Sequence, residues 1–367
     1  MISHILIAIT IFCQYIISCI VGLSTHRRLI NIIGGIFSFS LYWVAFGGVN
    51  NTTDWGGYEY IYENDDFSID FIFRFLSVQA KLLGLNYIYL YQFHIILTGA
   101  LLTFFISRFT SNIFFVSTFV ILILFIPLAN QIRFFLGLSL FLNAIYFLCI
   151  KKKKVLFLII GLISVLCHLG IIQLFLFIPI YFIENNKNYL KTLIIISTSI
   201  YILIATLFTL DGTMSELGLR ENIDLYFQSD YESSFLGSLF QSLPILIITT
   251  VLFNNKNYFI NKINHFQDEK LYFLYRLTFF SFIFIPASFL TQIILFRYCI
   301  ALFFVWILLI LRTAKYEKRN IQIRKISLLF IIQYIYILYL YFLPILILNS
   351  HSTIEKFYLI IDSIKFN

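Results

Sequence analysis

The sequence predicts an all-α integral membrane protein, a polytopic bundle of about twelve transmembrane helices. Of its 367 residues, 60% are hydrophobic and only 12% are charged, and its mean hydropathy is +0.91. A soluble chain of this length needs far more polar surface to cover its core. Apolar runs recur along the whole chain, each near the roughly 18 residues that cross a bilayer. We therefore expect one polytopic membrane domain over residues 1–367.

The charge and cysteine patterns argue against several other classes of protein. The formal net charge of +8 fits membrane orientation better than nucleic-acid binding, because basic residues of membrane proteins collect on the cytoplasmic side. The cysteines lie in apolar segments without CxxC spacing, which disfavours a disulfide framework or a zinc site. No P-loop and no strand-linked dinucleotide motif is present in the sequence, so ATP-driven transport and cytoplasmic nucleotide-sugar chemistry are disfavoured.

The expected spans follow the apolar runs in chain order. The first has no basic segment before it and no clear cleavage site, so we interpret it as a retained helix and not as a signal peptide. The expected spans are residues 2–23, 29–47, 87–107, 113–129, 134–150, 155–169, 171–183, 192–210, 236–253, 271–290, 295–312 and 327–348.

Basic clusters decide how the apolar run 155–183 crosses the membrane. Lys151–Lys154 precede this run and Lys187 follows it. If both clusters are cytoplasmic, the run must enter and return as a hairpin whose tip lies near His168. The same argument makes 271–312 a second hairpin with an outer tip.

Two long segments collect acidic residues and are predicted to be outer loops. They are residues 48–86 and residues 211–235. The twelve-span topology then places both termini outside and most lysines and arginines in short cytoplasmic loops. We therefore expect any chemistry to lie at the outer ends of the helices and in these loops.

Arg133 is the first candidate site residue. It lies where a predicted helix enters from the outer face, and Asn130 and Gly137 fall on its side of that helix. A charge at the bilayer edge indicates function, and a guanidinium can hold a diphosphate through bidentate hydrogen bonds. Arg297, beside Tyr298 at a matching outer edge, is the second diphosphate-binding candidate. Contact with lipid headgroups is the alternative for both arginines.

His168 and Asp54 are the candidates for proton transfer. A neutral imidazole at the hairpin tip is suited to accept a proton from an attacking hydroxyl, although capping of backbone carbonyls explains His168 equally well. Asp54 opens an aromatic run with Trp55 and Tyr58, and carbohydrate sites combine aromatic faces with carboxylates. Interfacial aromatic belts have the same composition. Arg74 lies in a following segment suited to an interfacial helix, and it joins Trp55 and Tyr58 as a glycan-binding candidate.

Three segments resemble the EpsG-like and Wzy-type polysaccharide polymerases of bacterial surface-glycan gene clusters. They are TDWGGYEYIYEN with SIDFIFRFLSVQAKLLGLNYIYLYQF, then NQIRFFLGLSLFLNAIYFLCIKKKKVLFLIIGLISVLCHLGIIQLFLFIP, and FRYCIALFFVWILL near the C-terminus. Arg133, His168 and Arg297 match the arginine and histidine positions of the family. Phe134 and Phe135 depart from it, because the family often has glutamine and alanine after the first arginine.

The resemblance implies a surface-glycan (O-antigen) polymerase similar to the GT-C-like membrane glycosyltransferases. Such an enzyme transfers the growing glycan from undecaprenyl diphosphate to the non-reducing end of an incoming lipid-linked repeat unit. It works at the bacterial inner (plasma) membrane, with its active site facing the periplasm or the cell exterior. Arg133 and Arg297 would stabilise the departing diphosphate, and His168 or Asp54 would deprotonate the acceptor hydroxyl. No cofactor, metal or nucleic acid is expected, and a chain-length-regulating membrane protein is the implied partner.

Three other functions stay open. A flippase for the same lipid-linked sugar would show internal repeats with broken helices, which the sequence does not display. A membrane O-acyltransferase would place its catalytic groups near the cytoplasmic face, whereas His168 is predicted outside. An O-antigen ligase differs from a polymerase only in its acceptor, so the residues do not separate these two.

Overall fold

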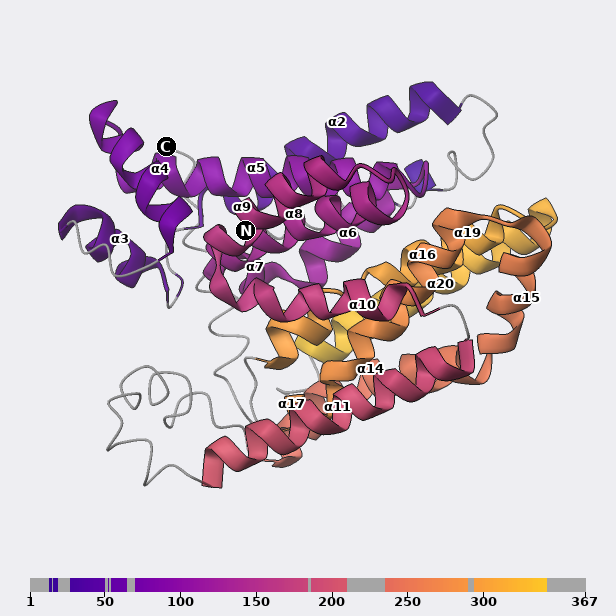
Figure 1. Cartoon of the computed structure of the whole chain (residues 1–367). Helices are drawn as coiled ribbons and strands as arrows, with labels where there is room; N and C mark the ends of the chain where they lie inside the picture. The colour runs from indigo at the N-terminus through magenta and orange to yellow at the C-terminus, as the bar shows by residue number, and fades with distance from the viewer. Residues whose placement is uncertain are drawn as a thin grey trace. The chain divides into compact units, whose positions relative to one another are not determined.

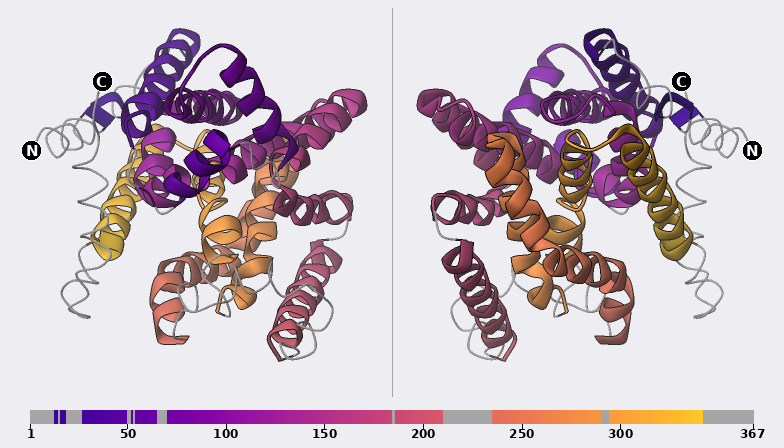
Figure 2. Two further views of the ribbon diagram at one scale, coloured as in Figure 1. Left: turned by 90° about the vertical axis from the view of Figure 1, so that its left-hand side faces the viewer. Right: turned by 90° about the vertical axis from the view of Figure 1, so that its right-hand side faces the viewer.

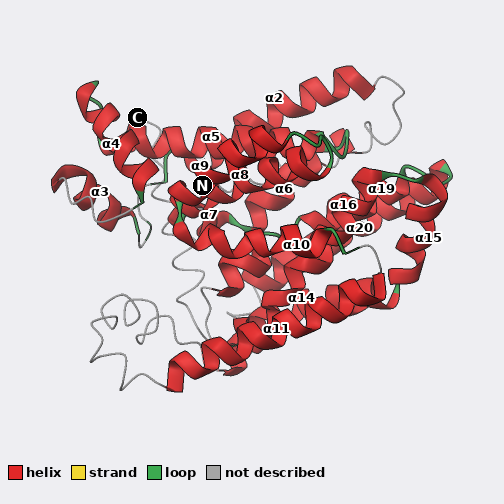
Figure 3. Cartoon of the chain, viewed as in Figure 1, coloured by secondary structure: helices red, strands yellow, loops and turns green. Residues whose placement is uncertain are grey.

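The structure, a computed structural model, is helical throughout the part of the chain that it describes. It describes residues 13–14, 16–18, 27–49, 52, 54–64, 70–183, 186–209, 235–289 and 294–341, and no strand occurs among them (Figure 3). The chain divides into two compact units. Unit 1 comprises Met1–Phe175 and Ile310–Asn367, and unit 2 comprises Leu176–Leu309. The single domain expected over residues 1–367 stays a prediction.

Figure 1 shows the helices of the two units. Unit 1 contains α2 (Arg27–Phe46), α3 (Trp55–Asn64), α4 (Phe71–Leu82), α5 (Tyr87–Ser107), α6 (Ile113–Ile123), α7 (Phe125–Asn130), α8 (Ile132–Cys149), α9 (Lys154–Cys167), η1 (Leu169–Leu176) and α20 (Arg319–Tyr341). Unit 2 contains α10 (Phe177–Tyr181), α11 (Asn186–Thr209), α14 (Phe235–Asn254), α15 (Lys256–Phe266), α16 (Glu269–Ser281), η2 (Phe282–Phe284), α17 (Ile285–Ser288) and η3 (Leu295–Ile300), and α19 (Val305–Ala314) begins in it.

Within the described residues, five helical stretches are long and apolar enough to cross a membrane. They are Arg28–Phe46, Tyr87–Ser107, Ile132–Cys149, Glu269–Ser288 and Arg297–Ala314. Shorter apolar helices occupy several other predicted spans, among them α6, α9 and α14. The structure therefore supports a helical membrane protein, and the count of twelve spans stays a prediction. Most of the first expected span, and the outer loop from 211 to 234, lie outside the described residues.

α8 is the central helix of unit 1. It packs along α9 and α5, and α5 packs in turn against α2. The side chains of α8 are buried nearly all round from Phe134 to Ile145, the pattern of a helix enclosed by others. Asn143 donates from Nδ2 to the carbonyl oxygen of Leu101 on α5 at 3.0 Å, a polar tie of the kind that joins helices in lipid. By contrast, α9 exposes apolar residues such as Val155, as a lipid-facing helix does.

The chain reverses at His168, as the charge pattern predicts. His168 has φ −163° and ψ 118°, an extended conformation that ends α9. η1 then returns along α9, so that the Phe175 ring centroid lies 6.1 Å from that of Phe157. Gly137 on α8 makes this packing possible, because a Cβ there would lie 2.8 Å from the carbonyl oxygen of Ser164. The hairpin and α8 therefore form one tightly packed scaffold.

The predicted first outer loop contains two helices, α3 and α4, which lie across one end of α5 (Figure 2). Trp55 anchors α3, with its ring centroid 4.8 Å from that of Tyr87 at the start of α5. α4 buries Phe73, Ser77 and Ala80 on one face, and this spacing of three and four residues is that of an amphipathic helix. α4 also packs against α9. The two short helices thus close over the end of the unit where the hairpin turns.

Unit 2 is built around the helices α16 and α17. Asp268 caps α16 by accepting from the backbone N–H groups of Lys270 at 3.0 Å and Leu271 at 3.3 Å. α16 is buried from Leu271 to Ser281, so it is the enclosed helix of this unit, as α8 is in unit 1. α11 and α14 both contact α17, and Figure 2 shows them on either side of these orange helices.

Candidate active site

Arg133 lies in the first turn of α8, where the helical path of the chain is broken. α7 ends at Asn130, Gln131 takes φ −100° and ψ 51°, and α8 starts at Ile132. Such a break leaves the first N–H groups of α8 directed toward the helix end, where the helix dipole is positive. The Arg133 side chain retains 15% of its surface exposed. A guanidinium therefore stands at a helix N-terminus, a position that favours anion binding.

Asp70 is the acidic partner of Arg133. It occupies the N-cap position of α4, and its Oδ2 lies 2.8 Å from Nη1 of Arg133, with 19% of its side chain exposed. The sequence around Asp70 does not mark it as a site residue, because an aspartate just before an amphipathic run has the pattern of an ordinary N-cap. Its partner lies 63 residues further along the chain. Only the fold brings this carboxylate and this guanidinium together.

Aromatic rings surround the Arg133 guanidinium. Its Cζ lies 4.7 Å from the ring centroid of Tyr58 and 5.8 Å from that of Phe73, and Nη2 donates weakly to the Tyr58 hydroxyl at 3.4 Å. The Phe73 ring also packs on His94, 5.6 Å away between centroids. His94 is buried and its Nδ1 donates to the carbonyl oxygen of Leu90 at 2.8 Å, so it acts as a packing residue. The rings hold Arg133 in a defined direction through cation–π contacts.

His168 ends α9 and contacts Phe134, the residue that follows Arg133 on α8. Its ring meets that of Phe134 edge to face, with centroids 5.4 Å apart. The backbone N–H of Gly170 donates to Nδ1 of His168 at 3.0 Å. Because Nδ1 accepts this bond, the neutral imidazole carries its proton on Nε2. Asp70 occupies the N-cap of α4, and α4 packs against α9, the helix that His168 ends.

The predicted site residues at the start of α3 have different surroundings. Tyr58 contacts Arg133, whereas Trp55, one turn earlier, is only 8% exposed. The Trp55 indole donates to Oε2 of Glu59 at 3.1 Å, and its ring packs against Tyr87 and Tyr91. Asp54 stands in the turn just before, where its carbonyl oxygen accepts the Tyr58 N–H at 3.1 Å. Tyr58 therefore links the aromatic run of the sequence to the guanidinium.

The structure also describes the two remaining predicted arginines, Arg74 and Arg297. Arg74 follows Phe73 on α4 and its side chain is exposed. Arg297 belongs to unit 2, in the π-helical segment η3, and is half-buried beside the buried Tyr298. Tyr298 stacks on Phe284, with centroids 4.7 Å apart. The structure thus brings Arg133, Tyr58 and the α9 end with His168 together in unit 1, and it describes Arg297 separately.

The sequence model of the EpsG family matches residues 32–355, most of the chain. The chain belongs to the EpsG family. Proteins of this family are Wzy-type polymerase-like, so the chain is a polysaccharide-polymerase-like membrane protein of the glycosyltransferase kind. Comparison with curated proteins and with solved structures finds no match.

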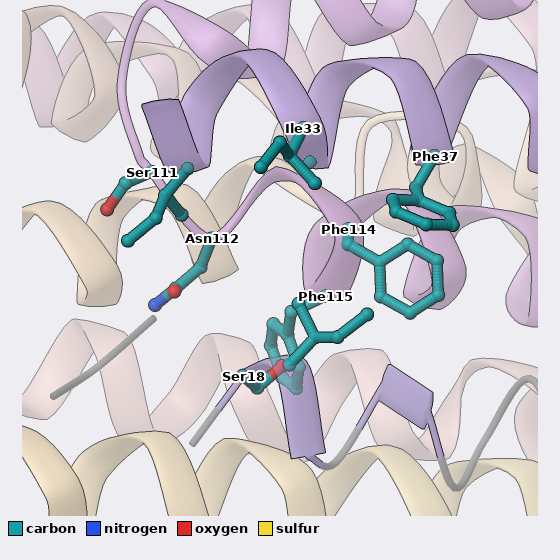
Figure 4. A pocket seen from close by; sticks show the side chains of 10 residues that line it. Ser18, Ile33, Phe37, Ser111, Asn112, Phe114 and Phe115 are labelled. Atoms are coloured by element: carbon teal, nitrogen blue, oxygen red, sulfur yellow. The ribbon is translucent and has the colours of Figure 1, made fainter. Parts of the chain in front are cut away.

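This EpsG-family chain also contains an apolar cavity of about 220 Å³ in unit 1 (Figure 4). Ser111 and Asn112 line one end, and Phe37 and Phe114 line the other. Its lining includes no charged side chain and none of the predicted site residues. The charged cluster around Arg133 is therefore better equipped for polar chemistry than this cavity.

The cluster combines four chemical properties. Arg133 offers a planar set of N–H donors that matches phosphate geometry. Asp70 offers a carboxylate that can hold or accept a proton, and His168 offers an Nε2 proton that can be donated. The aromatic rings of Tyr58 and Phe73 supply faces next to the cation. Such a site can bind a diphosphate ester and handle one proton beside it.

Proposed function

We propose that this EpsG-family chain is a surface-polysaccharide (O-antigen type) polymerase. It transfers the growing glycan from undecaprenyl diphosphate to the non-reducing end of an incoming lipid-linked repeat unit. The observation that carries the proposal is the partly exposed Arg133 at the N-terminus of α8, with Asp70 at 2.8 Å and Tyr58 beside it. Family membership supports the same reaction class.

The chemistry requires a cation at the leaving group. The bond between the anomeric carbon and the diphosphate oxygen breaks, and negative charge develops on the diphosphate. A guanidinium held in place before the reaction stabilises this charge, and loss of one such donor typically costs about 100-fold to 1,000-fold in rate. Arg133 and the α8 N-terminus provide this stabilisation, and Arg297 is the second proposed diphosphate ligand. The reaction needs no metal or organic cofactor in this scheme.

The other predicted residues take roles around the sugars. Tyr58 and Arg74 bind the glycan, with Tyr58 holding both the guanidinium and a sugar face. Trp55 contributes through α3, because its buried ring fixes the helix that carries Tyr58. His168 and Asp54 are the proposed proton-handling groups.

The proposed topology places this site outside the cytoplasm. The basic loops between the spans face the cytoplasm, and the Arg133 end of α8 with the His168 turn faces the periplasm or cell exterior of a bacterial inner (plasma) membrane. The full bundle then has about twelve spans and is similar to GT-C-like membrane glycosyltransferases. The lipid bilayer delivers the undecaprenyl-diphosphate-linked oligosaccharide laterally. A chain-length-regulating membrane protein is the proposed protein partner.

The decisive experiment is the surface-glycan profile of cells that lack this gene. The strain is complemented with the wild type, Arg133→Ala, His168→Ala or Arg297→Ala, with equal protein amounts in the membrane. We expect deletion to collapse the glycan ladder to a single repeat on the lipid core, the wild type to restore it, and Arg133→Ala to leave it collapsed.

Other outcomes distinguish the alternatives. Loss of both the ladder and the single-repeat product would indicate a flippase or a ligase. Retention of a normal ladder in the deletion strain would overturn the polymerase proposal. A ladder of normal length that lacks O-acetyl or other acyl groups would indicate an O-acyltransferase.

A further inference from the structure

We propose that Asp70 accepts the proton of the acceptor hydroxyl, and that the substrate diphosphate frees it for this task by taking over Arg133. This inference rests on the proposed polymerase function and adds a catalytic residue to it. Asp70 lies in the segment between two predicted spans, and its only signal in the sequence is that of a helix cap. Its role becomes visible because its carboxylate meets Arg133 in unit 1 at 2.8 Å.

Asp70 and Tyr58 both contact the Arg133 guanidinium. Nη1 donates to Asp70 and Nη2 is directed to the Tyr58 hydroxyl. Each of these nitrogens carries a second N–H, so a diphosphate competes with Asp70 and Tyr58 for the N–H groups that they occupy, and it exchanges with Asp70 where it takes over Nη1. The protein carboxylate and the substrate diphosphate are alternative anions for one cation. When the diphosphate binds, Asp70 loses a cation and gains an anion nearby, and both changes favour its protonated form.

The anomeric carbon reacts close to the Arg133 guanidinium. It is bonded to a diphosphate oxygen, so a sugar phosphate held by Arg133 brings this carbon near the same guanidinium. Asp70 is a direct neighbour of the same guanidinium. Its carboxylate is thus beside the reacting centre from the start. With 15% and 19% of their side chains exposed, Arg133 and Asp70 are both reachable by substrate.

His168 is oriented as a hydrogen-bond donor. Its Nδ1 accepts the Gly170 N–H at 3.0 Å, so the neutral ring presents a proton on Nε2. In that form Nε2 is a hydrogen-bond donor and not a base. His168 is therefore suited to donate to the departing diphosphate or to a sugar oxygen, while a carboxylate takes the proton.

The resulting step is balanced. The acceptor hydroxyl oxygen forms a bond to the anomeric carbon, and its proton moves to the Asp70 carboxylate. The bond from the anomeric carbon to the diphosphate oxygen breaks, and its electron pair leaves with the undecaprenyl diphosphate. Asp70 returns its proton to solvent when the diphosphate departs, and Arg133 re-forms the ion pair.

The test uses the purified full-length protein in lipid nanodiscs with a lipid-linked repeat unit as substrate. Asp70→Asn keeps the shape of the side chain and removes the base. We expect turnover to fall by at least about 100-fold, the lower range of general base catalysis. Binding of inorganic pyrophosphate, measured by its protection of Arg133 from a guanidinium-specific reagent, should be unchanged or tighter, because the competing carboxylate is gone. Glu63→Gln, the same change at an exposed carboxylate on α3, is the matched control and should retain full turnover.

Separate outcomes overturn separate claims. If wild-type protein makes no polymer, the proposed function fails before Asp70 is tested. If wild type is active and Asp70→Asn retains more than a third of its turnover, Asp70 is not the base. If Asp70→Asn binds pyrophosphate several-fold more weakly, Asp70 only positions Arg133.

Two further variants keep the test decisive if Asp70→Asn does not fold. His168→Gln retains an N–H donor near the position of Nε2, and it should lose at least ~10-fold less turnover than His168→Ala if the ring acts as a donor. Equal and complete loss in both would make His168 the base and exclude Asp70. Asp54→Asn supplies the remaining comparison, because complete loss of turnover there would place the base at Asp54 and contradict the proposal.

Discussion

The two units each enclose an arginine within apolar helices, and the two arginines have opposite surroundings. Arg133 of unit 1 has 15% of its side chain exposed and forms an ion pair with Asp70. Arg276 of unit 2 is fully buried in α16, where its Cζ lies 3.8 Å from the ring centroid of Tyr189 and 4.8 Å from that of Tyr272. Intramembrane charges are expensive and are usually functional. A helical membrane protein can therefore hold a charge in two ways, in a partly exposed ion pair or buried among aromatic rings.

The difference lies in what can reach each guanidinium. At Arg133 an incoming anion exchanges with an existing carboxylate, so the charge stays compensated before and after binding. At Arg276 the faces of the guanidinium are covered by rings, and the Tyr189 hydroxyl donates to the Arg276 carbonyl oxygen at 2.5 Å. These contacts join α11 to α16. We therefore infer that Arg133 serves binding and that Arg276 serves packing.

Replacement of Arg133 should produce the largest loss of activity. Arg133→Ala removes the cation at the α8 N-terminus, and we expect the polymerisation rate to fall at least about 100-fold, which corresponds to about 3 kcal/mol of transition-state stabilisation. Arg133→Lys should recover only part of this, because an ammonium lacks the planar fork. The rate is measured in membranes from the deletion strain. Arg28→Ala, a change of an exposed arginine on α2, is the control and should leave the rate within twofold.

Replacement of Arg276 should affect stability and spare the chemistry. Arg276→Ala removes the cation–π contacts and leaves a cavity, which we expect to cost about 2–4 kcal/mol of unfolding free energy. Arg276→Met fills most of the space without a charge and should cost less. Thermal unfolding in detergent, followed by tyrosine fluorescence and gel filtration, measures the change. The rate per folded molecule should stay near wild type, and a specific loss of rate at full stability would contradict the assignment to packing.

Some of these features can be predicted from the sequence, and others depend on packing. Helix positions follow from apolar runs, and α5 begins and ends at the predicted residues 87 and 107. The reversal at His168 follows from the basic clusters on either side. Asp70 was not foreseen, because a pairing across 63 residues leaves no local pattern. Arg276 carried a usable signal, a cation within a predicted span, but its burial among tyrosines depends on how α11 packs on its neighbours.

The same limit applies to the aromatic run of α3. The sequence offers Trp55 and Tyr58 equally as sugar-binding rings. Burial separates them, because Trp55 is enclosed by Tyr87 and Tyr91 whereas Tyr58 borders the guanidinium. Residues three apart share a helix face, so the sequence pattern does not separate the two rings, and the packing of α3 on α5 decides which of them is enclosed.

An intermediate effect is expected where α8 and the hairpin make close contact. A Cβ on Gly137 would lie 2.8 Å from the Ser164 carbonyl oxygen and 2.9 Å from Cγ1 of Ile171. Gly137→Ala should therefore push the hairpin away from α8, at a cost of about 1–3 kcal/mol, and reduce turnover by moving His168 relative to Arg133. Gly35→Ala on α2 meets only an ordinary contact at 3.8 Å and serves as the control. Equal melting temperatures for the two variants would contradict this close packing.

The smallest effects should come from one hydroxyl beside each arginine. Tyr58→Phe keeps the ring next to Arg133 and removes only the 3.4 Å contact from Nη2, so we expect a loss of less than about threefold in rate and no change in unfolding temperature. Tyr189→Phe removes the 2.5 Å hydrogen bond to the Arg276 carbonyl oxygen and should cost about 1 kcal/mol of stability, with no change in rate. The two conservative variants thus separate rate from stability in the same way as the two arginines. If Tyr58→Phe lowered stability while Tyr189→Phe lowered the rate, the division of the two sites into binding and packing would be wrong.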